Sequence, residues 1–122
     1  MNSADIVIIV TPIEQDTLLR LVEGYHGDMV KYVVDLERQV IAVGGEFHAD
    51  AEALLLEDGS RQPDIWGTNY YPDQPEATCI EYTSLINISP ARGNPGMELL
   101  DPELRRQLRE LTFRLIGRGT SG

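Results

Sequence analysis

The polar side chains best placed for chemistry lie in one short segment, residues 44–50, with the sequence Gly-Gly-Glu-Phe-His-Ala-Asp. If this segment continues a strand, Glu46 and His48 project from the same face, and Asp50 lies where a following helix begins. One imidazole and two carboxylates could hold a divalent ion with open coordination positions. The same set could act as a general acid–base pair, because a nearby carboxylate raises the pKa of a histidine.

A purely structural role explains nearly every residue of the same segment. Gly44 and Gly45 allow the backbone to turn, and His48 or Asp50 can cap the helix that follows. Asp50 and Glu52 also complement the positive end of that helix. No pair of histidines at helical spacing is present to favour the metal interpretation. A strand-to-helix turn and a metal or acid–base site are therefore both open.

A second group of residues, Trp66, Asn69 and Tyr71, has the composition of a recognition surface. Tryptophan and tyrosine combine a large apolar body with a polar tip and are common at binding surfaces. Trp66 also suits the core of a small domain. We expect Tyr71 to face away from its neighbour Tyr70, because side chains alternate along a strand.

A third group, Arg92, Gly93 and Asn94, lies in a loop rich in glycine and proline. Backbone N–H groups and the arginine of such a loop could cradle an anion. A plain connecting loop is the alternative. Cys79 has no basic neighbour in the sequence to lower its pKa, which makes it a poor candidate for a nucleophile.

The composition limits the class of protein. The 122 residues fit a single domain over residues 1–122, with a frayed tail expected at 119–122. A net charge of −10 argues against nucleic acid and against an anionic membrane surface as partners. The single cysteine excludes an intrachain disulfide, and the apolar run at residues 6–10 is too short for a signal peptide or a membrane span. We therefore expect a cytoplasmic protein.

The residue pattern predicts five strands and three helices. The strands are expected over 6–10, buried on both faces, and over 29–35, 39–43, 66–71 and 79–88. One helix is expected to begin at a capping box formed by Thr11 and Glu14 and to end at Gly24 or Gly27. The others are expected over 49–57 and from Asp101 to Gly117.

The order of these elements is β-α-β-β-α-β-β-α. Paired strands that alternate with helices favour an α+β fold, with a mainly antiparallel sheet of about five strands covered by three helices. A doubly wound parallel sheet would instead need single strands between the helices.

Several short stretches of the chain resemble a family of small bacterial and archaeal proteins, the domain of unknown function DUF5674. Among them are Val34-Asp35-Leu36-Glu37, the run from Ala42 to Asp50, Gly59-Ser60-Arg61-Gln62, the run from Trp66 to Pro72, and Ile86-Asn87-Ile88. With Gly27-Asp28-Met29-Val30-Lys31, they cover most of residues 27–95. The resemblance implies no activity, cofactor or catalytic residues.

Two functions are compatible with these observations. The first is a small cytoplasmic binding or protein-interaction domain without catalytic activity, with self-association through a sheet edge or a helix face as one form of partner. The second is a divalent-metal-binding protein or metal-dependent hydrolase that uses Glu46, His48 and Asp50. The direction of the His48 side chain distinguishes the two.

Overall fold

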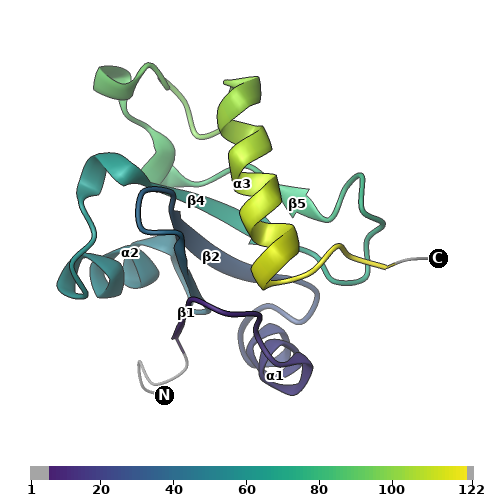
Figure 1. Ribbon diagram of the computed structural model, residues 1–122. Helices are drawn as coiled ribbons and strands as arrows, with labels where there is room; N and C mark the ends of the chain where they lie inside the picture. Colours follow the sequence, from purple (N-terminus) through teal and green to yellow (C-terminus); the bar gives the residue numbers. More distant parts are fainter. Residues whose placement is uncertain (1–5, 121–122) are drawn as a thin grey trace.

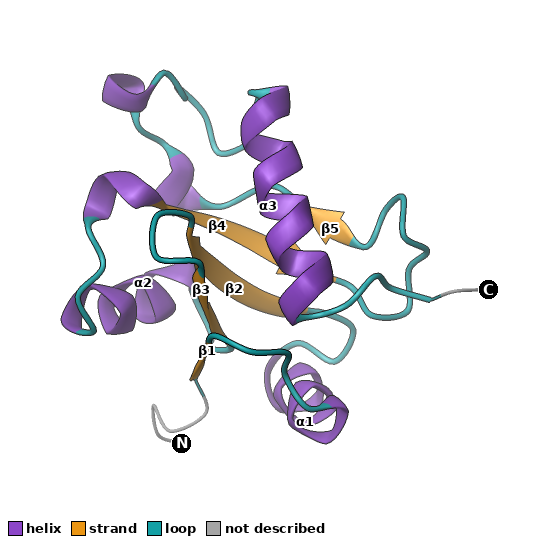
Figure 2. Ribbon diagram, in the orientation of Figure 1, coloured by secondary structure: helices purple, strands orange, loops and turns teal. Residues whose placement is uncertain are grey.

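The computed structural model describes residues 6–120 of the chain. The main elements are β1 (Val7–Ile9), α1 (Gln15–Tyr25), β2 (Val30–Asp35), β3 (Val40–Val43), α2 (His48–Glu57), β4 (Ile65–Tyr70), β5 (Ile80–Glu81) and α3 (Pro102–Leu115). Three short 3-10 turns are η2 (Gln62–Asp64), η3 (Leu85–Asn87) and η4 (Pro90–Arg92). The strands form one five-stranded antiparallel sheet in the order β1-β3-β2-β4-β5 (Figure 2). The predicted α+β class and order of elements are confirmed.

Alternation of side chains along the strands gives the sheet two apolar faces, and each face is covered by helices. Tyr32 and Val34 of β2 pack in one cluster with the buried leucines of α1 and α3. Val33 packs in a second cluster with Ala51 and Leu55 of α2. Helices α1 and α3 therefore cover one face and α2 covers the other (Figure 1).

The central strand β2 fixes the geometry of the later site. Its register with β4 places Lys31 opposite Asn69 and Val33 opposite Gly67. Lys31, Val33, Gly67 and Asn69 all belong to the face that α2 covers, because alternate residues share a face. The side chains of Lys31 and Asn69 are therefore neighbours on that face, with Cβ atoms about 4.5–5.5 Å apart.

Helix α1 begins later than predicted, because the expected capping box at Thr11 does not form. The N-cap residue is Glu14, whose side chain makes no capping hydrogen bond. Ile13 is held elsewhere, since its N–H donates to the carbonyl oxygen of Leu115 at the end of α3, at 2.9 Å. This long-range contact holds Ile13 outside the helix. Strand β1 is an edge strand, and Val7 and Ile8 are only partly buried, so the expectation of burial on both faces is wrong there.

The strand predicted over residues 79–88 is largely replaced by turns. Only Ile80 and Glu81 pair with β4, and η3 follows at Leu85–Asn87. Beyond β5, the side chain of Asn87 pairs with the edge of β4. Its Oδ1 accepts from Gly67 N–H at 2.8 Å, and its Nδ2 donates to Gly67 O at 2.9 Å. The predicted strand is shorter because the side-chain amide of Asn87, rather than the backbone of a longer β5, forms the hydrogen bonds with Gly67 at the edge of β4.

Both ends of α3 are held firmly. Asp101 caps its first turn as predicted, with Oδ1 accepting from Glu103 N–H at 2.9 Å. A frayed tail was expected from residue 119, and the described part of it makes two hydrogen bonds. Gly119 N–H donates to Tyr70 Oη at 2.8 Å, and Thr120 N–H donates to the carbonyl oxygen of Gln74 at 2.8 Å. Residues 121 and 122 lie outside the described residues.

Candidate functional site

The segment 44–50 forms the predicted turn between β3 and α2. Gly44 and Gly45 have φ angles of 113° and 98°, a region that favours glycine because other residues are strained there. The chain then enters α2 with Phe47 as the N-cap residue, and no side chain caps the helix. The expected cap by His48 or Asp50 is therefore wrong. His48 is instead the first residue of α2.

The imidazole of His48 connects the start of α2 to the sheet. Nε2 lies 2.7 Å from the carbonyl oxygen of Thr68 in β4, and the residue is 6 % exposed. A carbonyl oxygen can only accept, so this bond places the proton on Nε2 and leaves the lone pair of the neutral ring on Nδ1. Burial lowers the pKa of His48 to about 4, the hydrogen bond to Thr68 opposes this effect, and the charge of Lys31 lowers the pKa further.

The carboxylates predicted to join His48 do not form a metal site with it. Glu46 and Asp50 are exposed, whereas His48 is buried against β4. Within residues 6–120, no group of three or more His, Cys, Asp or Glu side chains is arranged to hold a metal ion. His48 thus lies in a different environment from Glu46 and Asp50, and this arrangement gives the metal interpretation no support.

A groove of about 320 Å³ lies beside His48, and we call it the His48 groove. The beginning of α2, the strands β2 and β4, and the segment around η3 contribute to it. Three of its apolar side chains are exposed to solvent, with exposed fractions of 63 % for Phe47, 70 % for Leu85 and 41 % for Met97. The remaining lining residues are Lys31, His48, Ala49, Asn69, Thr83, Ser84 and Ile86.

The polar side of the His48 groove contains an unsatisfied acceptor. Asn69 is 4 % exposed, and its Nδ2 donates to Glu81 Oε1 at 2.8 Å. A hydrogen bond between its amide and the His48 ring favours the protonated ring, because only that form carries an N–H on both ring nitrogens. The neutral ring has its one N–H on Nε2, which donates to Thr68. Asn69 Oδ1, however, is buried and accepts no hydrogen bond within the described part of the chain. A buried acceptor without a donor is costly, which makes this atom a natural point of contact for a ligand.

The predicted recognition surface of Trp66, Asn69 and Tyr71 is divided by the sheet. Asn69 and Tyr71 do come together, because the Tyr71 hydroxyl donates to the same Glu81 Oε1 at 3.1 Å. Trp66 lies on the other face, buried in the core with α1 and α3. Its alternative role as a core residue is the one observed.

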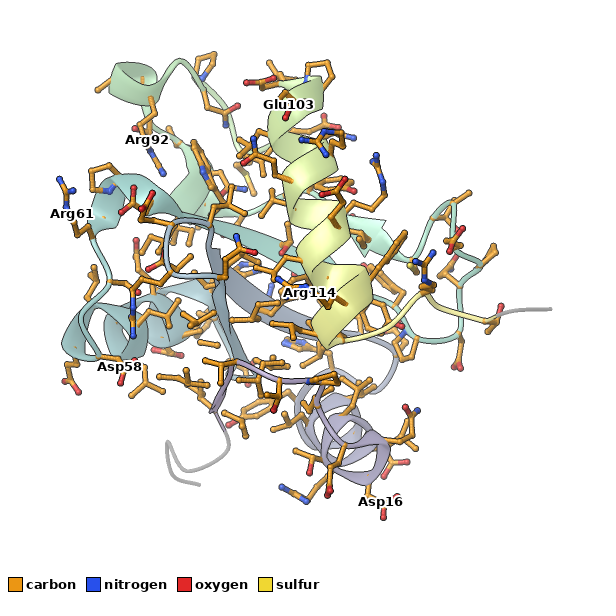
Figure 3. All side chains as sticks on the ribbon, viewed as in Figure 1. Asp16, Asp58, Arg61, Arg92, Glu103 and Arg114 are labelled. Carbon is orange, nitrogen blue, oxygen red and sulfur yellow. The ribbon has the colours of Figure 1, made fainter. Side chains whose placement is uncertain are left out.

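The predicted anion loop of Arg92, Gly93 and Asn94 is internally bonded. Arg92 lies 3.5 Å from the centre of the Trp66 ring and donates to the carbonyl oxygen of Ile65 at 2.8 Å. Asn94 Nδ2 donates to the carbonyl oxygens of Asn87 and Gly96, at 3.0 and 2.9 Å. Figure 3 shows Arg92 directed from its turn toward the body of the molecule, whereas Arg61 points outward.

The hollow beside this loop is unsuited to an anion. Its volume is about 390 Å³, and two carboxylates, those of Asp101 and Glu103, line it together with Arg92. Their negative charge opposes an anionic ligand. Arg92 Nη1 already donates to the carbonyl oxygens of Pro63 and Ile65, and Arg92 Nε is buried without a partner among the described residues. The loop therefore has the features of a structural connection.

A larger and more polar groove, of about 590 Å³, lies between β5 and α3. Its charged side chains already have partners. Arg105 pairs with Glu98 at 2.8 Å and stacks over the ring of Tyr82, while Glu81 accepts from Asn69 and Tyr71. The His48 groove differs because Asn69 Oδ1 has no donor and Lys31 forms no salt bridge among the described residues, and this difference makes it the stronger candidate site.

A family model covers nearly the whole described chain. The family described as "Protein of unknown function (DUF5674)" matches residues 7–115. The chain belongs to this family. The DUF5674 match includes the whole sheet, all three helices and every residue that lines the His48 groove. Comparisons with curated proteins and with solved structures returned no match. In this DUF5674 chain, no helix among residues 6–120 is long and apolar enough to cross a membrane.

Sequence reasoning identified His48 and Asn69 but missed the rest of this DUF5674 groove. Phe47, Leu85 and Met97 come from separate segments, and no spacing connects them. Only Lys31 could have been selected from the sequence, because it is the only lysine in an acidic chain. The burial of Cys79 raises the pKa of its thiol, in agreement with its low suitability as a nucleophile.

Proposed function

We propose that this protein is a binding domain without catalytic activity and that the His48 groove is its ligand site. One observation carries the proposal. Exposed Phe47, Leu85 and Met97 border a groove in which Asn69 presents a buried acceptor that has no donor among the described residues. A mostly apolar pocket with a few convergent polar groups is the usual form of a ligand site.

The state of His48 supports binding over catalysis. With a pKa of about 4, about one ring in a thousand is protonated at pH 7, so the residue is a poor general acid. It is also a weak base, because general bases work best with a pKa near the working pH. The Ser84 hydroxyl oxygen accepts from Ile86 N–H at 3.2 Å, and among the described residues it forms no hydrogen bond with His48 or Lys31, the basic residues of the groove.

The metal-dependent alternative has less support. It required Glu46, His48 and Asp50 to converge, and His48 instead bonds to Thr68. A titration with Zn²⁺, Mn²⁺ or Mg²⁺ tests it, because an ion that binds the folded state raises the melting temperature. We expect no change in melting temperature.

Location and partners are proposed on the same basis. The unpaired, buried thiol of Cys79 suits a reducing compartment, and we propose the cytoplasm. Self-association stays a prediction, to be tested by measuring the native mass with light scattering.

The binding proposal is tested by screening a library of small apolar fragments with two-dimensional NMR of the ¹⁵N-labelled protein. We expect the shifted amide signals to cluster at residues 31, 47–49, 69, 83–86 and 97. The variant Ala49→Trp fills the groove and should abolish these shifts. Ala53→Trp is the matched control, because Ala53 is also exposed on α2 but does not line the groove. Shifts scattered over the surface, or shifts that survive Ala49→Trp, would contradict the proposal.

A further inference from the structure

The charge of the His48 groove indicates the kind of ligand that it accepts. Lys31 is the only charged side chain that lines the groove, because His48 is neutral and no carboxylate lines it. The carboxylate of Glu81 lies next to the groove and is bonded to Asn69 Nδ2. No acidic group in the described chain forms a salt bridge with Lys31. In a chain with a net charge of −10, an unpaired and partly buried lysine is available for an anionic ligand group.

The sheet register places a complementary acceptor next to this lysine. Lys31 and Asn69 are directly opposite each other on β2 and β4. Asn69 Oδ1 is buried and without a donor, so a ligand N–H group would remove the cost of the unsatisfied atom. A ligand that carries a carboxylate and an N–H donor on the same carbon atom matches this pair.

The rest of the groove requires an apolar group of limited size. Phe47, Leu85 and Met97 provide an apolar rim, and the volume of about 320 Å³ is at the small end of the range for ligand sites. The groove is therefore matched in size to a small molecule.

We propose that the His48 groove binds a small carboxylate that carries an N–H donor and an apolar chain, the chemistry of an N-acylated amino acid. Its carboxylate pairs with Lys31, its N–H donates to Asn69 Oδ1, and its side chain packs against Phe47, Leu85 and Met97. This assignment rests on the binding function proposed above and adds the class of ligand.

The test compares acids with uncharged analogues of the same shape. N-acetyl-leucine, N-acetyl-methionine and N-acetyl-phenylalanine are titrated into the ¹⁵N-labelled protein, each beside its carboxamide. Ligands of about a dozen non-hydrogen atoms are expected to bind with millimolar Kd values. We expect at least one acid to shift the groove signals with a Kd about tenfold lower than that of its carboxamide.

Variants of Lys31 then test whether this residue causes the tighter binding of the acid relative to its carboxamide. Lys31→Met should weaken the acid about tenfold and leave the carboxamide unchanged, because it removes the charge and keeps the apolar stem. Lys31→Gln serves as a second variant if Lys31→Met folds poorly. Arg61→Met is the matched control, since it removes the same charge from an exposed site outside the groove and should change neither Kd.

The outcomes separate the two proposals. Equal binding of acid and carboxamide in the groove would overturn the carboxylate assignment and leave the binding function standing. The carboxylate assignment would also be overturned if none of the three acids shifts the groove signals up to about 10 mM while neutral fragments still do. The binding function would again be left standing. If neither the acids nor the fragment library shifts these signals, the binding function itself is wrong. Tighter binding of a longer peptide that ends in the same residue would overturn the assignment to a free small molecule.

Discussion

The side-chain amide of Asn87 and the backbone of Gly67 form a reciprocal pair of hydrogen bonds, at 2.8 and 2.9 Å. In this arrangement the amide supplies one acceptor and one donor, as a residue of a neighbouring strand would. Asn87 is fully buried and also donates to the carbonyl oxygen of Met97 at 3.2 Å. One side chain thus completes the edge of β4 and positions the segment that borders the His48 groove.

Replacement of Asn87 by alanine should therefore be strongly destabilising. The variant leaves the N–H and C=O groups of Gly67 buried without partners. Each unsatisfied group costs about 1–3 kcal/mol of folding free energy. We expect the free energy of unfolding to fall by about 3 kcal/mol, measured by urea denaturation and followed by the fluorescence of Trp66. Leu85→Ala, in the same turn and 70 % exposed, is the control and should change the stability by less than about 0.5 kcal/mol. Equal stabilities of Asn87→Ala and Leu85→Ala would contradict the assigned role.

The backbone of Gly67 lies too close to Ser84 for any side chain. A Cβ atom at position 67 would lie 2.7 Å from both Cβ and Oγ of Ser84 and 3.0 Å from a side-chain carbon of Ile86. Gly67→Ala should cost about 2 kcal/mol of stability. In a double-mutant cycle, Ser84→Gly should recover at least about 1 kcal/mol of this loss. Additive effects of the two changes would show that the close approach is not the cause.

Acidification should destabilise the protein through His48. The folded-state pKa of about 4 lies below the usual value of 6.5, so between these two values the unfolded chain binds the proton more tightly. Stability is therefore lost as the pH falls through this window, by about 3 kcal/mol between pH 7 and pH 4.

His48→Gln isolates this contribution, because glutamine keeps an N–H donor for the Thr68 carbonyl but does not titrate. The difference in unfolding free energy between the wild type and this variant should decrease as the pH is lowered. Urea denaturation at a series of pH values measures this difference. A difference that does not vary with pH would contradict the buried, neutral state of His48.

Arg92 should resist replacement by lysine. Its planar guanidinium stacks on Trp66 while it donates to the carbonyl oxygens of Pro63 and Ile65, a combination that an ammonium group cannot reproduce. Arg92→Lys is expected to cost about 1–2 kcal/mol, and Arg61→Lys, at an exposed position, close to zero. Trp66 is the only tryptophan, so its emission spectrum should change in the first variant and stay constant in the second.

The fold was predictable from the sequence wherever local patterns and tertiary contacts agree. The hairpin of β2 and β3, the glycine turn before α2 and the Asp101 cap of α3 all follow from nearby residues. The predictions failed where distant contacts decide the local structure. Ile13 bonds to Leu115 and delays the start of α1, and Asn87 bonds to Gly67 in place of an extended β5.

The candidate site was predictable only in part for the same physical reason. His48 and Asn69 have distinctive side chains in recognisable segments, so both could be selected from the sequence. Phe47, Leu85 and Met97 become neighbours only when the segment after β5 folds back toward α2, and no sequence spacing records this contact. Sequence spacing likewise could not show that the turn separates Glu46 from the His48 ring.

The hydrogen bond between Ile13 and Leu115 has a consequence for the order in which the protein folds during synthesis. It connects the segment after the first strand to the last turn of the last helix, at 2.9 Å. While the ribosome is still producing α3, the apolar face shared by α1 and β2 lacks Leu108, Leu111 and Leu115 as cover. This face must therefore remain incompletely buried until α3 has left the ribosome, and we expect a chaperone that binds the nascent chain to contact it.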